Sequence, residues 1–493
     1  MLRAGDKLFS LTQFEEAAGM MYLTELAQDR ASGALRALAT RPVDLGPAHG
    51  GWLFCAGMPT PWGSHLGGEE YPVDARGFEH AHGRHPAFDR HLELFGLQPD
   101  DADRTRPAAL ARTSVYRIGY PVEVTLTGEQ LGTGPFAANA RATKHYAMGR
   151  LSWEVASVLP DRRTVYAGDD GIDRGLFRFV ADAPGDLSAG HLFAARLTQV
   201  SAADGGRFAI DWISLGHASS GQVDRLISQG VAFSDLFAAT GPVGDRCPNG
   251  FAPVQADGRQ ECLALRRSNR LGMAAAEIVI AASRLEPLRL AALRGASTEW
   301  HKLEGLAFDA VRQRLYLAVS VLGGAMSAAP ALVGLRNAIH LPANPCGAVY
   351  ALPVDADGVA TSMQALLAGL PRRDGQRPPR QADRCDIDRI AGPDNLAMGP
   401  TDDLLIIAED TNGHQNNVMW AYDLQAGTLT RILSSPYGAE TTSPFYYRDL
   451  NGFGYLTAVV QHPYGESDHD KARGQDDRRA VVGVIGPFPV IER

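Results

Sequence analysis

One cysteine and several acidic residues lie at the ends of apolar segments, where they could bind a metal. Cys55 lies at the end of an apolar strand in the segment WLFCAG, and Glu69 and Glu70 follow after the turn TPWG. A thiolate close to Gly57 could approach a metal closely, because glycine has no side-chain bulk. The alternatives are a buried thiol that acts as a small hydrophobic side chain, and two glutamates in a solvated turn.

Three further carboxylates lie in or before apolar strands. Glu154 stands in WEVASVL, where an unpaired carboxylate is costly and requires a cation, either a metal or Arg150. Glu304 follows Lys302 by two residues in KLEGLAFD, so on a strand both side chains would share one face. Asp394 precedes another strand and offers the hard oxygen ligand that Ca²⁺ prefers. Structural ion pairs or a turn cap would explain the same residues without a metal.

Strand–loop–strand units recur along the chain, and Glu154, Glu304 and Asp394 each precede one of them. RTVYAGDD leads to LFRFVAD, RLYLAVS leads to GAVYALPVD, and DLLIIAED leads to VMWAYDLQAG, while a hairpin from GYLTAVVQHPYG to AVVGVIGPFPV closes the chain. Recurrent units of this kind are typical of β-propeller blades, whose edges converge on a central channel. Convergent carboxylates repel one another unless cations lie among them. The pattern therefore predicts an all-β propeller with a polynuclear metal site of oxygen ligands and one thiolate.

Helix signals are few. One predicted helix begins at Phe14, and another begins at Ala274 and is broken near Pro287. We therefore expect a single propeller domain over residues 1–493, with peripheral helices, long inter-blade insertions and a helical N-terminal extension over about 1–45.

The cysteines indicate a redox compartment. Cys247 and Cys262 bracket a short polar stretch that predicts a disulfide-closed insertion, and Cys346 and Cys385 could form a second bridge, which leaves Cys55 alone. With these bridges the protein would be exported, whereas five reduced thiols would indicate a cytosolic protein. The N-terminus lacks the apolar region of a signal peptide, so the expected periplasmic or secreted location has no export signal in this chain.

Composition excludes several classes of protein. A net charge of −9, from 47 basic and 56 acidic residues, argues against a nucleic-acid partner. With 45% hydrophobic and 21% charged residues, the chain can bury a large core and is not disordered. The uncharged stretch 315–335 is interpreted as a buried strand that runs into a Gly/Ala loop, so we expect no membrane partner.

Several of these segments, taken in order, resemble the PhoX alkaline phosphatases, which are secreted bacterial enzymes with a six-bladed propeller. The resemblance runs in patches from about Gly50 to Pro463. The segments that carry it are FCAGMPTPWGSHLGGEE, GRLSWEVASVL, LEGLAFD, GPDNLAM and VVQHPYGE.

The resemblance implies a cluster of iron(III) and calcium bridged by an oxo group. Cys55 would be the thiolate ligand of iron, and Glu69 and Glu70 would lie near the cluster. The carboxylate ligands would be Glu154, Glu304 and Asp394.

Three residues depart from the family pattern. Trp153 stands where the family usually has His, and Met58 replaces a glycine. Lys302 stands where an Arg usually grips phosphate, and lysine is a point charge that cannot make the two-bond fork of a guanidinium. These departures bear on the class of substrate more than on the fold or on metal binding.

The sequence is thus interpreted as a monomeric metal-dependent phosphomonoesterase that acts on small phosphate esters, with Lys302 facing the phosphoryl oxygens. Two other functions fit the same pattern. One is a calcium-dependent propeller lactonase or esterase, which needs no thiolate. The other is a non-catalytic metal-binding propeller, because fold alone does not fix function.

Overall fold

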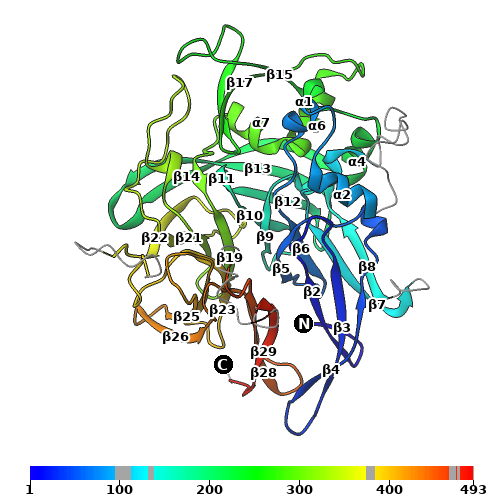
Figure 1. The fold of residues 1–493 in the computed structure, drawn as a ribbon, viewed down its shortest axis with the longest axis vertical. Coiled ribbons are helices and arrows are strands. Elements are labelled where there is room, and N and C mark those ends of the chain that lie inside the picture. Colours follow the sequence, from blue (N-terminus) through cyan, green and yellow to red (C-terminus); the bar gives the residue numbers. More distant parts are fainter. Residues whose placement is uncertain (95–112, 132–137, 373–382, 466–473, 475–477, 492–493) are drawn as a thin grey trace.

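The computed structural model describes residues 1–94, 113–131, 138–372, 383–465, 474 and 478–491. Most strands form antiparallel meanders in which neighbours in sequence pair with each other (Figure 1). The first sheet contains β1 (Leu2–Ala4), β2 (Lys7–Gln13), β3 (Met21–Gln28) and β4 (Leu35–Pro42). The next contains β5 (Phe54–Pro59), β6 (His65–Glu69), β7 (Val122–Leu131) and β8 (Ala138–Lys144).

A nine-stranded sheet joins two further meanders through the pairing of β14 with β22. One meander contains β9 (Trp153–Val158), β10 (Thr164–Asp169), β12 (Phe177–Ala183), β13 (Asp186–Ser201) and β14 (Arg207–Ser219). The other contains β19 (Leu303–Asp309), β20 (Arg314–Val319), β21 (Ala348–Pro353) and β22 (Ser362–Ala368). The C-terminal sheets contain β23 (Pro393–Met398), β24 (Leu404–Glu409), β25 (Val418–Asp423) and β26 (Thr428–Ser434), then β27 (Glu440–Tyr447), β28 (Phe453–Gln461) and β29 (Val481–Pro489).

The first strands of successive meanders lie side by side. β5 contacts β9, β9 contacts β19, β19 contacts β23, β23 contacts β27, and β27 returns to β5. Close approach between them depends on residues without a side chain. A Cβ atom at Gly168 would lie 2.3 Å from the Glu304 carbonyl oxygen, and one at Gly305 would lie 2.3 Å from that of Asp394. Glycine at these two positions therefore lets strands from different meanders meet at the centre.

Helices and a small sheet cover one end of the molecule, at the top of Figure 1. The predicted break at Pro287 is confirmed, because it separates α6 (Ala275–Leu285) from α7 (Pro287–Leu293). The other α-helices that lie within the described residues are α1 (Ala75–His80), α2 (Pro86–Leu94), α4 (Ser220–Ser228) and α5 (Phe233–Leu236). The small sheet contains β15 (Phe237–Thr240), β16 (Ala252–Ala256) and β17 (Arg259–Leu265).

The prediction of a helical extension over about 1–45, with a helix from Phe14, is wrong. This segment forms the strands β1–β4. Met21 and Leu23 are buried while Tyr22 and Thr24 are more exposed, which is the two-residue period of a half-buried strand. Pairing of β3 with β2 and β4 outweighs the helix propensity of the Ala- and Glu-rich residues.

The predicted strand units, the buried uncharged strand and both disulfide bonds are present in the structure. The four strand–loop–strand units are the paired strands β10–β12, β20–β21, β24–β25 and β28–β29. The uncharged stretch begins with β20 and continues into a loop, and none of the helices in the described residues is long and apolar enough to cross a membrane. Disulfide bonds link Cys247 with Cys262 and Cys346 with Cys385, and Cys55 is a free thiol.

Candidate metal centre

Glu154, on β9, lies at the centre of a buried group of acidic residues. Its Oε2 atom accepts a hydrogen bond of 3.0 Å from the Cys55 thiol, and its Oε1 atom accepts one of 2.9 Å from Asn395 Nδ2. Asn395 also donates to Asp394 Oδ1, at 2.7 Å. The thiol from β5 and the Asp–Asn pair from β23 therefore meet the β9 carboxylate from two sides.

Two sets of three side chains have the spacing of metal ligands. Cys55, Glu70 and Glu154 each offer one atom within 4.8 Å of the others, and so do Glu154, Asp170 and Glu304. Glu154 belongs to both sets, so two neighbouring cation positions would share one carboxylate. Asp170 Oδ1 is buried and has no hydrogen-bond partner among the described residues, as expected of an oxygen reserved for a cation.

Local irregularities of the strands aim these side chains inward. Each strand that carries or precedes a member of the group has a shift in register at that place. The shifts lie between Phe54 and Gly57 on β5, Ala167 and Asp169 on β10, Leu303 and Leu306 on β19, and Pro393 and Leu396 on β23. Such bulges bend a strand and redirect a side chain, and they are common beside active sites.

Electrostatics shows why the group requires cations. Burial raises the pKa of Glu154 to about 7, and the charge of Asp170 adds to the effect. Burial, with repulsion from neighbouring acids, raises the pKa values of three other carboxyls, those of Glu70, Glu304 and Asp394. Burial and Glu154 likewise raise the pKa of the Cys55 thiol. Only positive charge placed among these groups would keep all of them ionised at neutral pH.

Lys302 borders the group and supplies one such charge. Its Nζ atom lies 2.9 Å from Glu304 Oε1 and 3.2 Å from Asp410 Oδ2, and the charge of Glu304 raises the lysine pKa. Burial would raise the pKa of Asp170, but the charges of Lys302 and Arg174, together with hydrogen bonds to the Asp170 carboxylate, outweigh burial, and the pKa falls below its usual value. Lys302 thus lies beside Glu304 as predicted. It does so through a left-handed φ of 57° between β18 (Trp300–His301) and β19, and not through regular strand alternation.

The two adjacent glutamates after the TPWG turn face different surroundings. Glu70 lies in the metal-ligand group, whereas Glu69 is fully buried elsewhere. Glu69 Oε1 pairs with Lys144 Nζ at 2.8 Å, and its Oε2 accepts hydrogen bonds from the backbone N–H groups of Gly119 and Tyr120 at 2.9 and 3.1 Å. The structure therefore brings Glu70, and not Glu69, to the centre.

Two members of the group, Asp170 and Asn395, lie outside the ligand set predicted from the sequence. Asp170 ends β10 in the pair GDD, and Asn395 follows Asp394, so both were visible as acids or amides at strand ends. The pair Asp169–Asp170 did not show which acid turns inward. In the structure Asp169 accepts a hydrogen bond from Ser152 N at 3.0 Å, while Asp170 accepts one from the Tyr71 hydroxyl.

Comparison with known proteins assigns the chain to a family. The family model "Alkaline phosphatase PhoX" matches residues 32–463. The chain belongs to the PhoX alkaline phosphatase family. It is therefore a phosphatase, as the resemblance of the sequence segments implied.

One solved structure supports the fold. The structure of Pseudomonas fluorescens PhoX in complex with vanadate, a transition state analogue, is 18% identical, with a TM-score of 0.56 over 94% of this chain and 79% of that chain. A Pseudomonas aeruginosa periplasmic gluconolactonase, PpgL, is 12% identical, with a TM-score of 0.29 over 87% of this chain and 83% of that chain. No curated protein sequence gives a significant match. The predicted PhoX-like propeller fold is confirmed, while the count of six blades stays a prediction.

Proposed function

We propose that this PhoX family member is a phosphomonoesterase that holds an iron–calcium cluster. The supporting observation is that two three-residue ligand sets share Glu154. The set with Cys55 includes a sulfur atom, which suits a transition metal such as iron. The set of Glu154, Asp170 and Glu304 contains only carboxylates, the hard ligands of calcium. Glu70 would complete the first set, and Asp394 lies beside Glu154 through Asn395.

When bound, the cations would stabilise negative charge on the phosphoryl oxygens and lower the pKa of attacking water. The protein groups have separate roles. Lys302 stays protonated beside Glu304 and presents N–H donors toward a phosphoryl oxygen at the edge of the cluster. The Tyr71 hydroxyl donates to Asp170 and fixes the orientation of that carboxylate. Burial of the acids excludes water from the site, which strengthens the attraction for the transition state.

We also propose that the protein works as an exported monomer with one propeller domain. Two disulfide bonds support an oxidising compartment, because such bonds are rare in the cytosol. A small phosphate ester is the proposed substrate, with no nucleic acid or membrane involved.

One experiment tests the catalytic part of this proposal. Elemental analysis of the purified protein should find iron and calcium, and hydrolysis of p-nitrophenyl phosphate should disappear after chelation and return when both metals are added. Glu154→Gln should lose both metals together, because this carboxylate belongs to both sets. Glu93→Gln, at an exposed position on α2, is the matched control and should change neither. Metal-loaded protein that hydrolyses lactones but not phosphate esters would refute the proposal.

A further inference from the structure

A cavity of about 360 Å³ opens beside the metal centre. Tyr71 and Lys302 line its inner side, and each also contacts a carboxylate of the centre, Asp170 or Glu304. The volume lies in the range of pockets that hold small ligands, roughly 300–1,000 Å³. A phosphoryl group at Lys302 would therefore place the rest of its ester in this cavity.

The outer wall of the cavity is a fixed hairpin. It is formed by the turn between β16 and β17, with Asp257 and Gly258 facing the cavity. Asp257 N donates to Asp173 O at 3.1 Å, and Gly258 N donates to Ile172 O at 3.0 Å. The Cys247–Cys262 disulfide links β17 of this hairpin to the segment that precedes β16. Such anchoring holds the wall in one position, as a specificity-determining surface requires.

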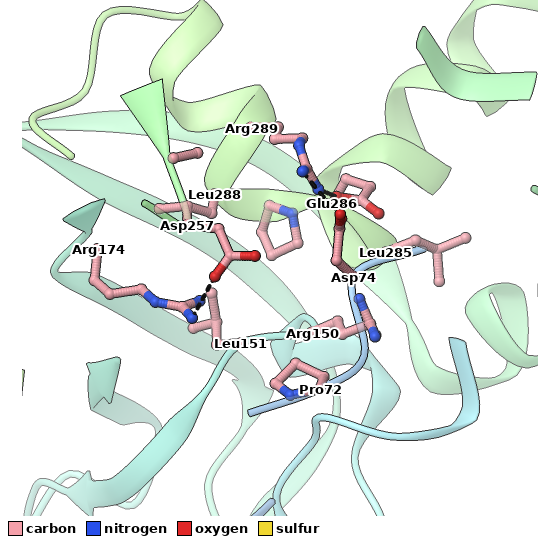
Figure 2. A pocket seen from close by; sticks show the side chains of 12 residues that line it. Pro72, Asp74, Arg150, Leu151, Arg174, Asp257, Leu285, Glu286, Leu288 and Arg289 are labelled. Carbon is pink, nitrogen blue, oxygen red and sulfur yellow. Dashed lines mark hydrogen bonds and ion pairs between the residues drawn. The ribbon is translucent and has the colours of Figure 1, made fainter. Parts of the chain in front are cut away.

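The cations that line the cavity already have acidic partners. Arg174, on β11 (Ile172–Arg174), donates to Asp257 Oδ1 at 2.7 Å and lies 3.7 Å from Asp169 Oδ1. Lys302 lies between Glu304 and Asp410. Figure 2 shows the Arg174–Asp257 pair, which also borders a second cavity of about 40 Å³. A second anion on the substrate would therefore meet Asp257 without an unneutralised cation to receive it.

One carboxylate acceptor and two apolar surfaces border this space. The side chain of Asp257 is 33% exposed and provides an acceptor. Tyr71 and Ile172 are 42% and 51% exposed, so they offer apolar surface to C–H groups. A carboxylate acceptor between apolar faces matches a molecule that carries hydroxyl groups on a carbon skeleton, because each hydroxyl can donate a hydrogen bond while the C–H groups contact the apolar faces.

We propose that this cavity binds the leaving alcohol and selects neutral polyhydroxyl groups, such as a sugar, over groups that carry a second negative charge. Asp257 accepts a hydrogen bond from a substrate hydroxyl, and Arg174 holds Asp257 in place. This inference rests on the proposed phosphomonoesterase function and adds the class of leaving group.

The test compares kcat/KM of the metal-loaded enzyme for three esters, namely glucose 6-phosphate, methyl phosphate and 3-phosphoglycerate. Wild type should prefer glucose 6-phosphate to 3-phosphoglycerate. Asp257→Asn should lower kcat/KM for glucose 6-phosphate about tenfold, because a hydrogen bond to a charged carboxylate is roughly twice as strong as one to a neutral amide oxygen. It should leave methyl phosphate unchanged and improve 3-phosphoglycerate. Asn tolerates the left-handed φ of 54° at this position, so the backbone is preserved.

Asp245→Asn is the matched control, since Asp245 is 66% exposed before the same disulfide loop and should change none of the three values. A wild-type enzyme that prefers 3-phosphoglycerate would overturn the inference, as would an equal effect of Asp257→Asn on all three esters. Failure of the wild type to hydrolyse any of the three would refute the proposed function itself.

Discussion

The adjacent glutamates 69 and 70 allow a sharp test of the site, because one substitution in each should have opposite effects. Glu69→Gln removes the charge that faces Lys144 in a pair whose side chains are 0% and 1% exposed. Lys144 keeps hydrogen bonds to the carbonyl groups of Gly50 and Arg117, but its charge has lost its partner. Breaking a buried ion pair from one side costs about 3–5 kcal/mol. We expect Glu69→Gln to destabilise the fold and to keep metals and activity.

Glu70→Gln should behave in the opposite way. The ligand atoms of Glu70 and Glu154 lie within 4.8 Å of each other. At an effective dielectric constant of about 20, two unit charges at that separation repel by about 3.5 kcal/mol. Partial protonation relieves part of this repulsion in metal-free wild type, and Glu70→Gln removes what remains of it. Without metal, Glu70→Gln should be more stable than wild type. After incubation with iron and calcium, it should bind less metal than wild type and have less activity.

Thermal unfolding of both variants, with and without chelator, measures these effects. The entropy of unfolding scales to about 1 kcal/mol/K for a chain of this length, so Glu69→Gln should lower Tm by about 3–5 °C. The double variant Glu69→Gln with Lys144→Met should recover most of the loss, because it removes both charges. Loss of metal from Glu69→Gln with an unchanged Tm would refute this assignment of the two glutamates.

Three further predictions concern the centre and its surroundings. Cys55→Ser should abolish a visible thiolate-to-iron absorption band and lower kcat/KM for p-nitrophenyl phosphate by more than the roughly 10–100-fold typical of outer-shell changes; an unchanged spectrum would exclude Cys55 as a ligand. Lys302→Arg should strengthen inhibition by inorganic phosphate and raise turnover, while Lys302→Ala should weaken substrate binding without loss of metal; unchanged kinetics in both would exclude its role. Burial alone would lower the pKa of His414, but the hydrogen bond to Glu409 and the charge of Glu409, together with the hydrogen bond to the Asp386 carbonyl, outweigh burial and raise it. Stability from this pair should be complete below about pH 6.5 and decline as pH rises through the folded pKa. Denaturant midpoints that fall equally in wild type and His414→Gln would contradict this.

The sequence predicts the paired strands well and the N-terminal segment badly. Units such as DLLIIAED to VMWAYD combine an apolar run with a turn, and their pairing partner is the next run along the chain. The segment from Phe14 has no such signal, because its helix-forming residues become strands only through pairing with β2. Register shifts at the site are equally invisible, because they depend on contacts between strands distant in sequence.

The acids of the centre could be found from sequence, but their directions could not. Cys55, Glu154, Glu304 and Asp394 stand out because each is placed in or beside an apolar strand. Adjacent acids such as Asp169 and Asp170 alternate between faces, and a single bulge decides which one turns inward. Local pattern therefore identifies candidate residues, while the three-dimensional packing of the strands selects among them.

Lys302 and the cavity beside it lead to one view of how this phosphatase would choose its substrate. Discrimination between esters depends on the total binding of the transition state. A lysine attracts the phosphoryl oxygens as a point charge and lacks the fork of a guanidinium, so phosphate itself contributes less to that total. The leaving group would then contribute more of the binding free energy of the transition state. It would do so at the disulfide-linked β16–β17 hairpin, where Arg174 holds Asp257 in place. Weak inhibition by free phosphate and strong selection of the alcohol are thus two consequences of one arrangement, and they should appear together in the wild-type enzyme.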